Sequence, residues 1–189
     1  MGVPLPATAE RFEWLEDTLQ LANRMWSGDD SSFSGRRVRA TRPIGSPPPA
    51  RVPHPPILIG GTGESKTLRL VARYADACNL PDMLDGGQFV RHKLTVLAGH
   101  CAVEGRPLDE IEKTVSTRLQ PGEPASSFVE RARALAGLGL DHLIVLTRGP
   151  WTLESLATLA AAIPAINELN GGQPAARQRA ATESRPGAA

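Results

Sequence analysis

The order in which apolar and amphipathic segments follow one another most constrains the fold of this sequence. Short apolar runs lie at 57–60, 75–80 and 140–146, and segments with apolar residues at helical spacing follow them at 64–75, 87–104 and 151–169. Strands that alternate with helices are typical of a parallel sheet, and an all-apolar strand indicates burial on both faces. The sequence therefore predicts an α/β fold with its ligand site at the carboxyl ends of the strands.

Three weaker signals complete this part of the chain. Segment 111–119 reads as a strand with polar alternation. Ser127 and Glu130 have the spacing of a capping box, which predicts a helix from there to about Leu138. Pro164 lies inside the last helical segment and predicts a kink there.

The N-terminal third carries a different pattern. Residues 9–27 predict an amphipathic helix, and residues around 33–40 predict a short strand or hairpin. The apolar face of the helix consists of Phe12, Leu15, Leu19, Ala22 and Trp26. Prolines between positions 43 and 56 predict an extended connector, because proline lacks an amide donor and disfavours helix in the residue before it.

The overall composition sets limits on compartment and partners. The formal net charge is +1 over 189 residues, and no apolar run approaches the roughly 20 residues needed to cross a bilayer. We therefore expect neither a nucleic-acid nor a membrane partner. Cys78 and Cys101 are too few for a disulfide framework, which predicts small buried thiols and a cytoplasmic protein.

Two segments depart from the average composition. Residues 34–51 hold five arginines and no acid. Such a segment can be an anion- or nucleic-acid-binding strip, or a solvated hairpin and connector; the second interpretation is favoured because no aromatic residue interleaves with the arginines. Residues 171–189 contain no large apolar side chain and predict a disordered tail, which leaves 1–170 as the folded part.

The stretch PPILIGGTGESKT, residues 55–67, contains the clearest binding signal. Its strand ends in a turn made of Gly60, Gly61, Thr62 and Gly63. Glycines let a ligand approach the main chain, and the helix that follows presents unpaired amides and the positive end of its dipole. Thr62 and Ser65 could add hydroxyl donors. The pattern predicts a phosphate-binding turn; the alternative is a tight strand-to-helix turn without a ligand.

The same stretch comes close to the P-loop of nucleoside-triphosphate hydrolases. Lys66 and Thr67 are in place, but Ser65 stands where the pattern requires its second glycine. An acid to hold magnesium at the end of a second apolar strand is not evident, since Thr147 follows one strand and Asp82 lies beyond another. The P-loop interpretation is therefore disfavoured.

The histidines offer no catalytic or metal-binding pattern. The four are His54, His92, His100 and His142. None is spaced with Cys, Asp or Glu as metal ligands are, and no Ser/His/Asp arrangement is apparent. We expect structural or surface histidines, with no metal site and no catalytic residue in this chain.

Several stretches carry a family resemblance. The segments PPILIGG and LRLVARYADACNL, with ERFEWLEDTLQLANRMWSG and FSGR upstream, resemble the luciferase-like monooxygenase family, and within it the branch that depends on the deazaflavin coenzyme F420. The resemblance runs from about Gly2 to near Asn170. It implies a (β/α)8 TIM barrel that binds F420, or alternatively FMN, at the carboxyl ends of its strands.

The resemblance also implies positions for individual residues. It makes 57–61, 75–80 and 140–146 the sixth, seventh and eighth barrel strands. The implied cofactor-binding residues are Gly60, Gly61, Thr62, Gly63 and Asn79. Asn79 lies at the end of the next strand, where it could face the cofactor.

The length of the chain qualifies this expectation. A full barrel takes roughly 250 residues, so the resemblance implies a partial barrel, about strands 6 to 8, without the units that carry the family's substrate-facing and catalytic groups. We expect a C-terminal fragment of a flavin- or F420-dependent oxidoreductase acting on an unknown small molecule, inactive alone, and either truncated or assigned too late a start. The alternative is a non-catalytic α/β module that associates with another chain, or with its own copy, through the open barrel edge.

Overall fold

The computed structural model describes residues 5–169. The chain divides between Pro56 and Ile57 into two compact units, each described here by itself. The predicted folded range of 1–170 stays a prediction, and the predicted disordered tail at 171–189 lies outside the described residues.

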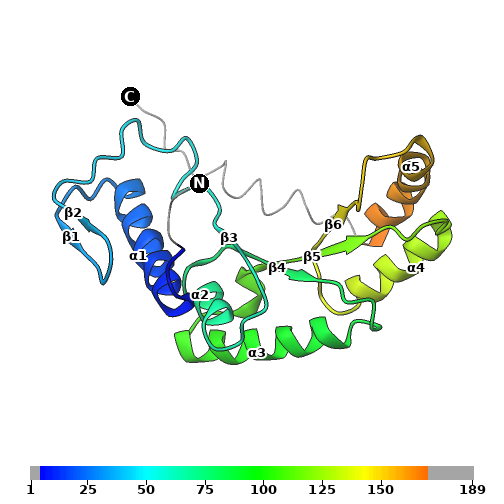
Figure 1. Cartoon of the computed structure of the whole chain (residues 1–189), viewed down its shortest axis with the longest axis horizontal. Helices are drawn as coiled ribbons and strands as arrows, with labels where there is room; N and C mark the ends of the chain where they lie inside the picture. The colour runs from blue at the N-terminus through cyan, green and yellow to red at the C-terminus, as the bar shows by residue number, and fades with distance from the viewer. Residues whose placement is uncertain (1–4, 170–189) are drawn as a thin grey trace. The chain divides into compact units, whose positions relative to one another are not determined.

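The first unit contains one long helix and a small hairpin (Figure 1). Helix α1 spans Thr8–Trp26, and strands β1 (Phe33–Ser34) and β2 (Arg39–Ala40) pair antiparallel. The predicted helix and hairpin are both confirmed. The Trp26 indole stacks on the His54 imidazole, with ring centroids 5.4 Å apart.

A buried carboxylate ties the hairpin to α1. Asp17 is 4% exposed, and its Oδ2 accepts hydrogen bonds from the main-chain N–H groups of Arg37 at 2.6 Å and Val38 at 2.9 Å. A Cβ placed on Gly35 would fall on the Asp17 carboxylate, so only glycine fits there. An acid thus occupies a buried position on a helix whose predicted apolar face is only half buried, because it satisfies the amides of the hairpin.

The second unit is built on a four-stranded parallel sheet (Figure 1). Its strands are β3 (Leu58–Gly60), β4 (Ala77–Pro81), β5 (Glu112–Arg118) and β6 (His142–Leu146), in that spatial order. This arrangement confirms the predicted α/β fold class, a part of a (β/α)8 barrel. The sheet holds one strand more than the implied numbering allows, because β5 lies between the strands predicted as seventh and eighth.

Helices follow the strands in the predicted alternation. They are α2 (Thr67–Tyr74), α3 (Gln88–Glu104), a 3-10 turn η1 (Leu108–Glu110), α4 (Ala125–Ala136) and α5 (Leu153–Leu169), which continues through Pro164. Helix α2 packs on α3, and α4 packs on α5. The core between helices and sheet is made of fully buried side chains, among them Leu68, Val71, Leu80, Val90, Leu97, Ile111, Val115 and Phe128. Both cysteines are buried, as predicted.

Two helix starts differ from the prediction. Helix α2 begins at Thr67 rather than 64, because residues 64–66 form a turn. The predicted capping box is wrong: α4 begins at Ala125, Pro124 precedes it, and no side chain caps it. Pro124, with φ fixed near the helical value, starts the helix earlier, so Ser127 and Glu130 lie inside it.

One face of the sheet is exposed to solvent at both edge strands, β3 and β6. Leu58 on β3 and Leu146 on β6 are 51% and 41% exposed. Within residues 5–169, β3 and β6 each pair with a single neighbouring strand. None of the helices in this range is sufficiently long and apolar to pass through a bilayer.

Candidate functional site

The glycine turn (residues 60–63) follows β3 at the carboxyl edge of the sheet. Gly61 has φ +133°, a backbone conformation that side chains rarely adopt. A Cβ on Gly63 would lie 2.8 Å from Thr67 Oγ1, too close for any real contact. Glycine is therefore required at 61 by backbone conformation and at 63 by packing.

The main-chain amides of the turn divide into two groups. The Gly61 N–H donates to the Asn79 carbonyl at 3.2 Å, and the Leu68 N–H donates to the Gly63 carbonyl at 3.0 Å. Between them, the amides of residues 62–65 have no main-chain acceptor within the part of the chain that the structure describes. Four exposed donors in succession, in the loop that leads into α2, are typical of turns that bind anions.

Thr67 is a residue whose role in this turn the sequence did not reveal. It is 8% exposed, and its side chain packs against the positions where Gly61 and Gly63 lack a Cβ. In the sequence Thr67 attracted attention only as the last residue of the P-loop pattern. In the structure its side chain packs against Gly61 and Gly63, which explains a small β-branched residue at the first position of α2.

Asn79 lies next to the turn but its side chain is already engaged. Its Nδ2 donates to Thr114 Oγ1 at 2.8 Å, and its Oδ1 accepts from Ser116 Oγ at 2.9 Å. This ladder between β4 and β5 explains the polar alternation of β5, since Thr114 and Ser116 lie on the face that carries Asn79. Asn79 therefore holds the turn through its main-chain carbonyl, and its side-chain Nδ2 keeps one further hydrogen for another acceptor.

Glu64, the residue after the turn, is fixed to α3. Its Oε1 accepts from Lys93 Nζ at 2.5 Å and contacts His92 Nε2 at 2.9 Å, and its carbonyl contacts His100 Nε2 at 2.7 Å. The hydrogen bond from Lys93, together with that from His92, lowers the pKa of Glu64 below its ordinary value. Both helix histidines thus have structural contacts, as expected, and no local spacing in the sequence indicates this anchor.

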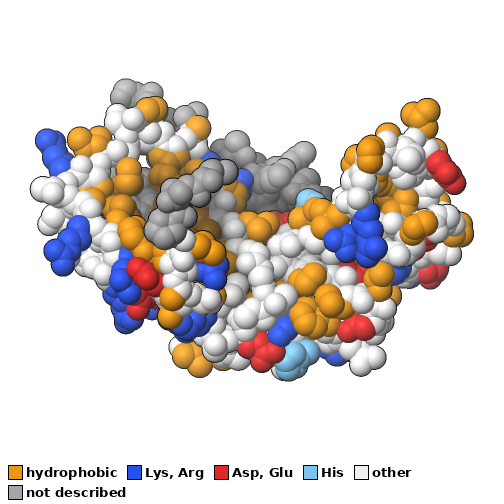
Figure 2. Space-filling view, in the orientation of Figure 1, with side chains coloured by type: hydrophobic (Ala, Val, Ile, Leu, Met, Phe, Trp, Pro, Cys, Tyr) orange, Lys and Arg blue, Asp and Glu red, His pale blue; other side chains and the backbone are white. Residues whose placement is uncertain are grey.

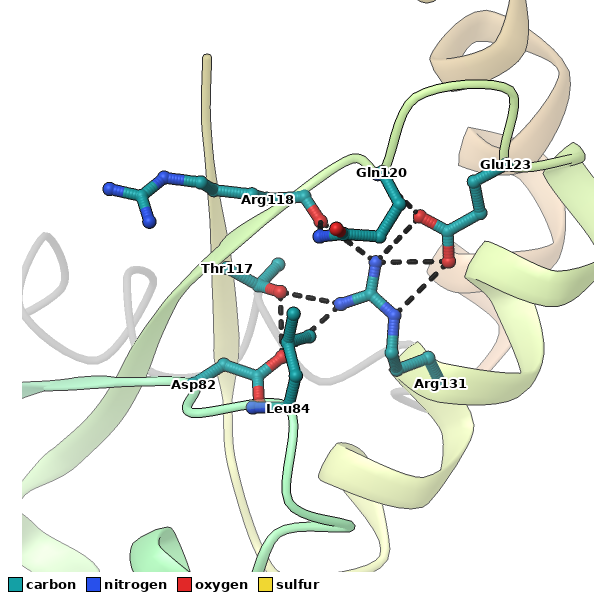
Figure 3. A network of polar contacts seen from close by, with 7 residues as sticks. All are labelled: Asp82, Leu84, Thr117, Arg118, Gln120, Glu123 and Arg131. Carbon is teal, nitrogen blue, oxygen red and sulfur yellow. Dashed lines mark hydrogen bonds and ion pairs between the residues drawn. The ribbon is translucent and has the colours of Figure 1, made fainter. Parts of the chain in front are cut away.

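A second polar network joins the next strand ends (Figure 3). Arg131 on α4 donates to Asp82 Oδ2 at 3.2 Å, to Thr117 Oγ1 at 2.6 Å and to the Arg118 carbonyl at 2.9 Å. Its guanidinium also holds both oxygens of Glu123, the shortest contact being 2.8 Å. The network fixes the loops after β4 and β5 to α4.

The acids of this network are nearly inaccessible to solvent. The side chains of Asp82 and Glu123 are 3% and 10% exposed. Asp82, which the sequence offered only as a poor candidate for holding magnesium, accepts from Thr117 Oγ1 at 2.7 Å and from the Leu84 N–H at 2.9 Å. Its hydrogen-bonding capacity is therefore used in positioning the strand ends.

The remaining candidate residues do not form a reactive centre. His142 Nδ1 lies 3.4 Å from Glu112 Oε1. Burial raises the pKa of Cys78 to about 11, so its thiol stays protonated. Among residues 5–169 there is no group of three His, Cys, Asp or Glu side chains placed to hold a metal ion.

Known proteins resemble this chain over most of its length. Two curated relatives are named F420-dependent glucose-6-phosphate dehydrogenase: one from Microbacterium testaceum, 24% identical over 141 residues, and one from Nakamurella multipartita, 26% identical over 140 residues. Each alignment covers 74% of this chain but only 41% and 40% of the relative, so the chain spans about two fifths of their length.

The fold has a counterpart among solved structures. The structure of an F420-dependent secondary alcohol dehydrogenase, in complex with an F420-acetone adduct, superposes with a TM-score of 0.71 at 10% identity, over 86% of this chain and 64% of that one. The sequence profile of the luciferase-like monooxygenases matches residues 1–184. The chain therefore belongs to the luciferase-like monooxygenase family.

Proposed function

We propose that this chain is the C-terminal part of an F420-dependent oxidoreductase and binds the phosphate of that cofactor on residues 62–65. The observation that carries the proposal is the run of amides in the loop between β3 and α2, which have no main-chain acceptor among residues 5–169 and lie on the carboxyl edge of a parallel sheet. The curated relatives, which are named as F420-dependent enzymes, support the choice of cofactor.

The residues present fit a phosphate monoester or diester. The amides of Thr62, Gly63 and Ser65 supply donors, and the exposed hydroxyls of Thr62 and Ser65 can add more. Gly61 contributes shape rather than a donor, because its amide is bonded to Asn79. When bound, F420 supplies a deazaflavin ring that exchanges a hydride with a substrate. FMN carries a phosphate too, and this turn does not discriminate between the two cofactors.

The neighbouring strands complete the proposed assignment. Asn79 orients the turn through its carbonyl and can donate its remaining N–H toward the cofactor. We assign no acid, base or nucleophile to this chain. Its partner is a small-molecule substrate, and its two free, buried cysteines agree with a cytoplasmic location.

The non-catalytic alternative rests on a separate observation. The open face of the sheet exposes Leu58 and Leu146 next to strand edges that are unpaired within residues 5–169. Such edges favour pairing with a second copy or another chain. Light scattering after size-exclusion chromatography tests this alternative, and a soluble monomer at high concentration would count against it.

Titration of the purified chain with F420, followed by the fluorescence of the cofactor, tests the proposed function. Gly63→Ala should weaken binding about ten-fold or more, because the new Cβ collides with Thr67 and displaces the turn. Gly99→Ala on α3 is the matched control, since a Cβ there meets nothing within 4 Å. Equal affinities of the two variants, or no binding of F420 and FMN at millimolar concentration, would overturn the proposal.

A further inference from the structure

A cavity of about 560 Å³ lies where β5 and β6 end, beside the start of α5. It is formed by the loop after β5, the loop after β6 and the first turns of α5. Parallel strands expose their ligand sites at this edge, so the cavity lies on the same side of the sheet as the glycine turn. Figure 2 shows basic side chains gathered on the surface near these strand ends.

Arg118 is one of two basic residues in the lining. It ends β5, and its carbonyl is held by Arg131 at 2.9 Å and by Gln120 Nε2 at 3.3 Å. The side chain points away from this network (Figure 3). Its guanidinium is exposed and forms no ion pair within residues 5–169. Arg118 is therefore a cation on a fixed main chain that is not engaged in an ion pair in the described part of the chain.

Arg148 is the second basic residue, on the loop after β6. Thr147 Oγ1 donates to the Gly149 carbonyl at 2.8 Å and lies 3.3 Å from the Gly149 N–H, so the residues on both sides of Arg148 are tied together. Arg148 is exposed and, like Arg118, forms no ion pair in the described part of the chain. Two arginines thus line one cavity, one at the end of β5 and one in the loop after β6.

The acids of the lining form no ion pair with Arg118 or Arg148 in the described part of the chain. Glu123 has its charge compensated by Arg131, which contacts both of its oxygens. Glu154 lies in the first turn of α5, where the helix dipole favours an acid. Because Arg131 also pairs with the buried Asp82, the charges around the cavity balance overall, and Arg118 and Arg148 are distinguished by forming no ion pair within residues 5–169.

An aromatic side chain completes the lining. Trp151 is 41% exposed and lies on the cavity wall. An exposed indole offers a flat apolar surface for the body of a ligand. The start of α5 itself contributes less, because the Ser155 N–H already donates to Thr152 Oγ1 at 3.1 Å.

We propose that this cavity binds a small organic anion, with its phosphate or carboxylate between Arg118 and Arg148 and its apolar body against Trp151. Guanidinium groups bind such oxyanions with strong, directed hydrogen bonds. The ends of β5 and β6 lie two and three strand spacings from the end of β3, which is about 10 to 14 Å across the sheet. That separation suits a substrate site beside a bound cofactor. Anion binding needs no cofactor, whereas the role of the anion as substrate rests on the proposed function.

Titration with phenyl phosphate, benzoate and inorganic phosphate, followed by tryptophan fluorescence and calorimetry, tests this inference. Arg118→Gln and Arg148→Gln should each weaken phenyl phosphate or benzoate binding about ten-fold. Arg91→Gln, an exposed arginine on α3, is the control and should bind as the parent chain does. Trp151→Phe should abolish the fluorescence change and keep the calorimetric signal.

The outcomes separate the two proposals. Whichever of phenyl phosphate and benzoate binds with this arginine dependence identifies the preferred oxyanion, phosphate or carboxylate. Equal affinity in all three arginine variants, or no binding, would overturn the inference. Loss of phenyl phosphate binding in Gly63→Ala, with unchanged binding in both Arg118→Gln and Arg148→Gln, would assign that anion to the glycine turn and would also overturn the inference. If Arg118→Gln loses phenyl phosphate binding and keeps F420 binding, the result supports both sites. If Arg118→Gln binds both phenyl phosphate and F420 as the parent chain does, the result overturns this inference and leaves the proposed function in place.

Discussion

Arg131 Nη1 lies 3.2 Å from Asp82 Oδ2, although 49 residues separate the two in the sequence. The contact joins α4 to the end of β4, and Thr117 Oγ1 bonds to both partners. A charged carboxylate with a 3% exposed side chain is stable only because this guanidinium and its hydrogen bonds compensate the charge.

Removal of the guanidinium should be strongly destabilising. Arg131→Met keeps much of the side-chain volume but leaves Asp82 and Glu123 without their cation, so we expect a loss of about 3 kcal/mol in the free energy of unfolding. Urea denaturation measures this loss. Arg133→Met on the same helix is the control, because its ion pair with Glu130 is exposed and should contribute at most about 0.5 kcal/mol. Similar losses in both variants would contradict this account.

Asp17 should make the first unit sensitive to acid. Burial acts to raise the pKa of Asp17, but the amides of Arg37, Val38 and Arg36 outweigh it and lower the pKa below 3.8. Between the folded and unfolded pKa the unfolded state binds more protons, so stability is full above about pH 4 and falls as the pH falls through the folded pKa.

Asp17→Asn tests this carboxylate directly. The variant should lose about 2 kcal/mol at neutral pH, because an amide offers the hydrogen-bond donors of the hairpin a weaker acceptor. Tryptophan fluorescence of the first unit during urea unfolding reports the loss. The difference from the parent chain should shrink in acid; a difference that stays constant down to the acid transition would show that Asp17 acts through packing alone.

Both cysteines should be inert in the folded chain. Burial raises the pKa of Cys78 to about 11 and also raises the pKa of Cys101, so little thiolate exists at about pH 8. Reaction with a disulfide reagent should be slow in buffer and fast for both thiols in concentrated urea. Rapid modification of one thiol in buffer would show that its helix or strand opens locally.

The sequence predicted the elements whose residues share an apolar pattern, and it did not predict the features that depend on contacts between residues far apart in the chain. Strands β3 and β6 were found because nearly all of their residues are apolar. The strand predicted at 111–119 is confirmed as β5 (Glu112–Arg118), but the resemblance gave it no place among the barrel strands, and its polar residues are explained only by their hydrogen bonds to Asn79. The capping box failed because Pro124 starts α4 before it.

The candidate site also has one part that the sequence predicts and another that it does not. The glycine turn has a local pattern, so its position at the carboxyl edge could be predicted. The contact between Glu64 and Lys93 that holds the turn could not be predicted, because 29 residues separate the two. The same is true of the neighbouring strand ends, where Asp82 lies 49 residues from Arg131. Contacts of this kind arise from the packing of helices on the sheet, and no spacing within one segment encodes them.

The anchor between Glu64 and α3 should set the affinity of the glycine turn for its anion. Lys93 is 8% exposed, and its ammonium group holds Glu64, the residue directly after Gly63. Lys93→Met should free the turn and weaken F420 binding about three- to ten-fold, because a mobile turn must be ordered on binding.

A matched variant separates this effect from a general loss of charge. Arg91→Met, two residues away on α3 and exposed, removes the same charge without touching the turn and should leave the F420 affinity unchanged. Glu64→Gln should reproduce the effect of Lys93→Met in weaker form, because the amide still accepts a hydrogen bond from Lys93. The double variant Glu64→Gln/Lys93→Met should bind no more weakly than Lys93→Met alone, since both changes break one contact. Additive losses in calorimetric titrations would show that Lys93 acts on the cofactor by another route than the turn.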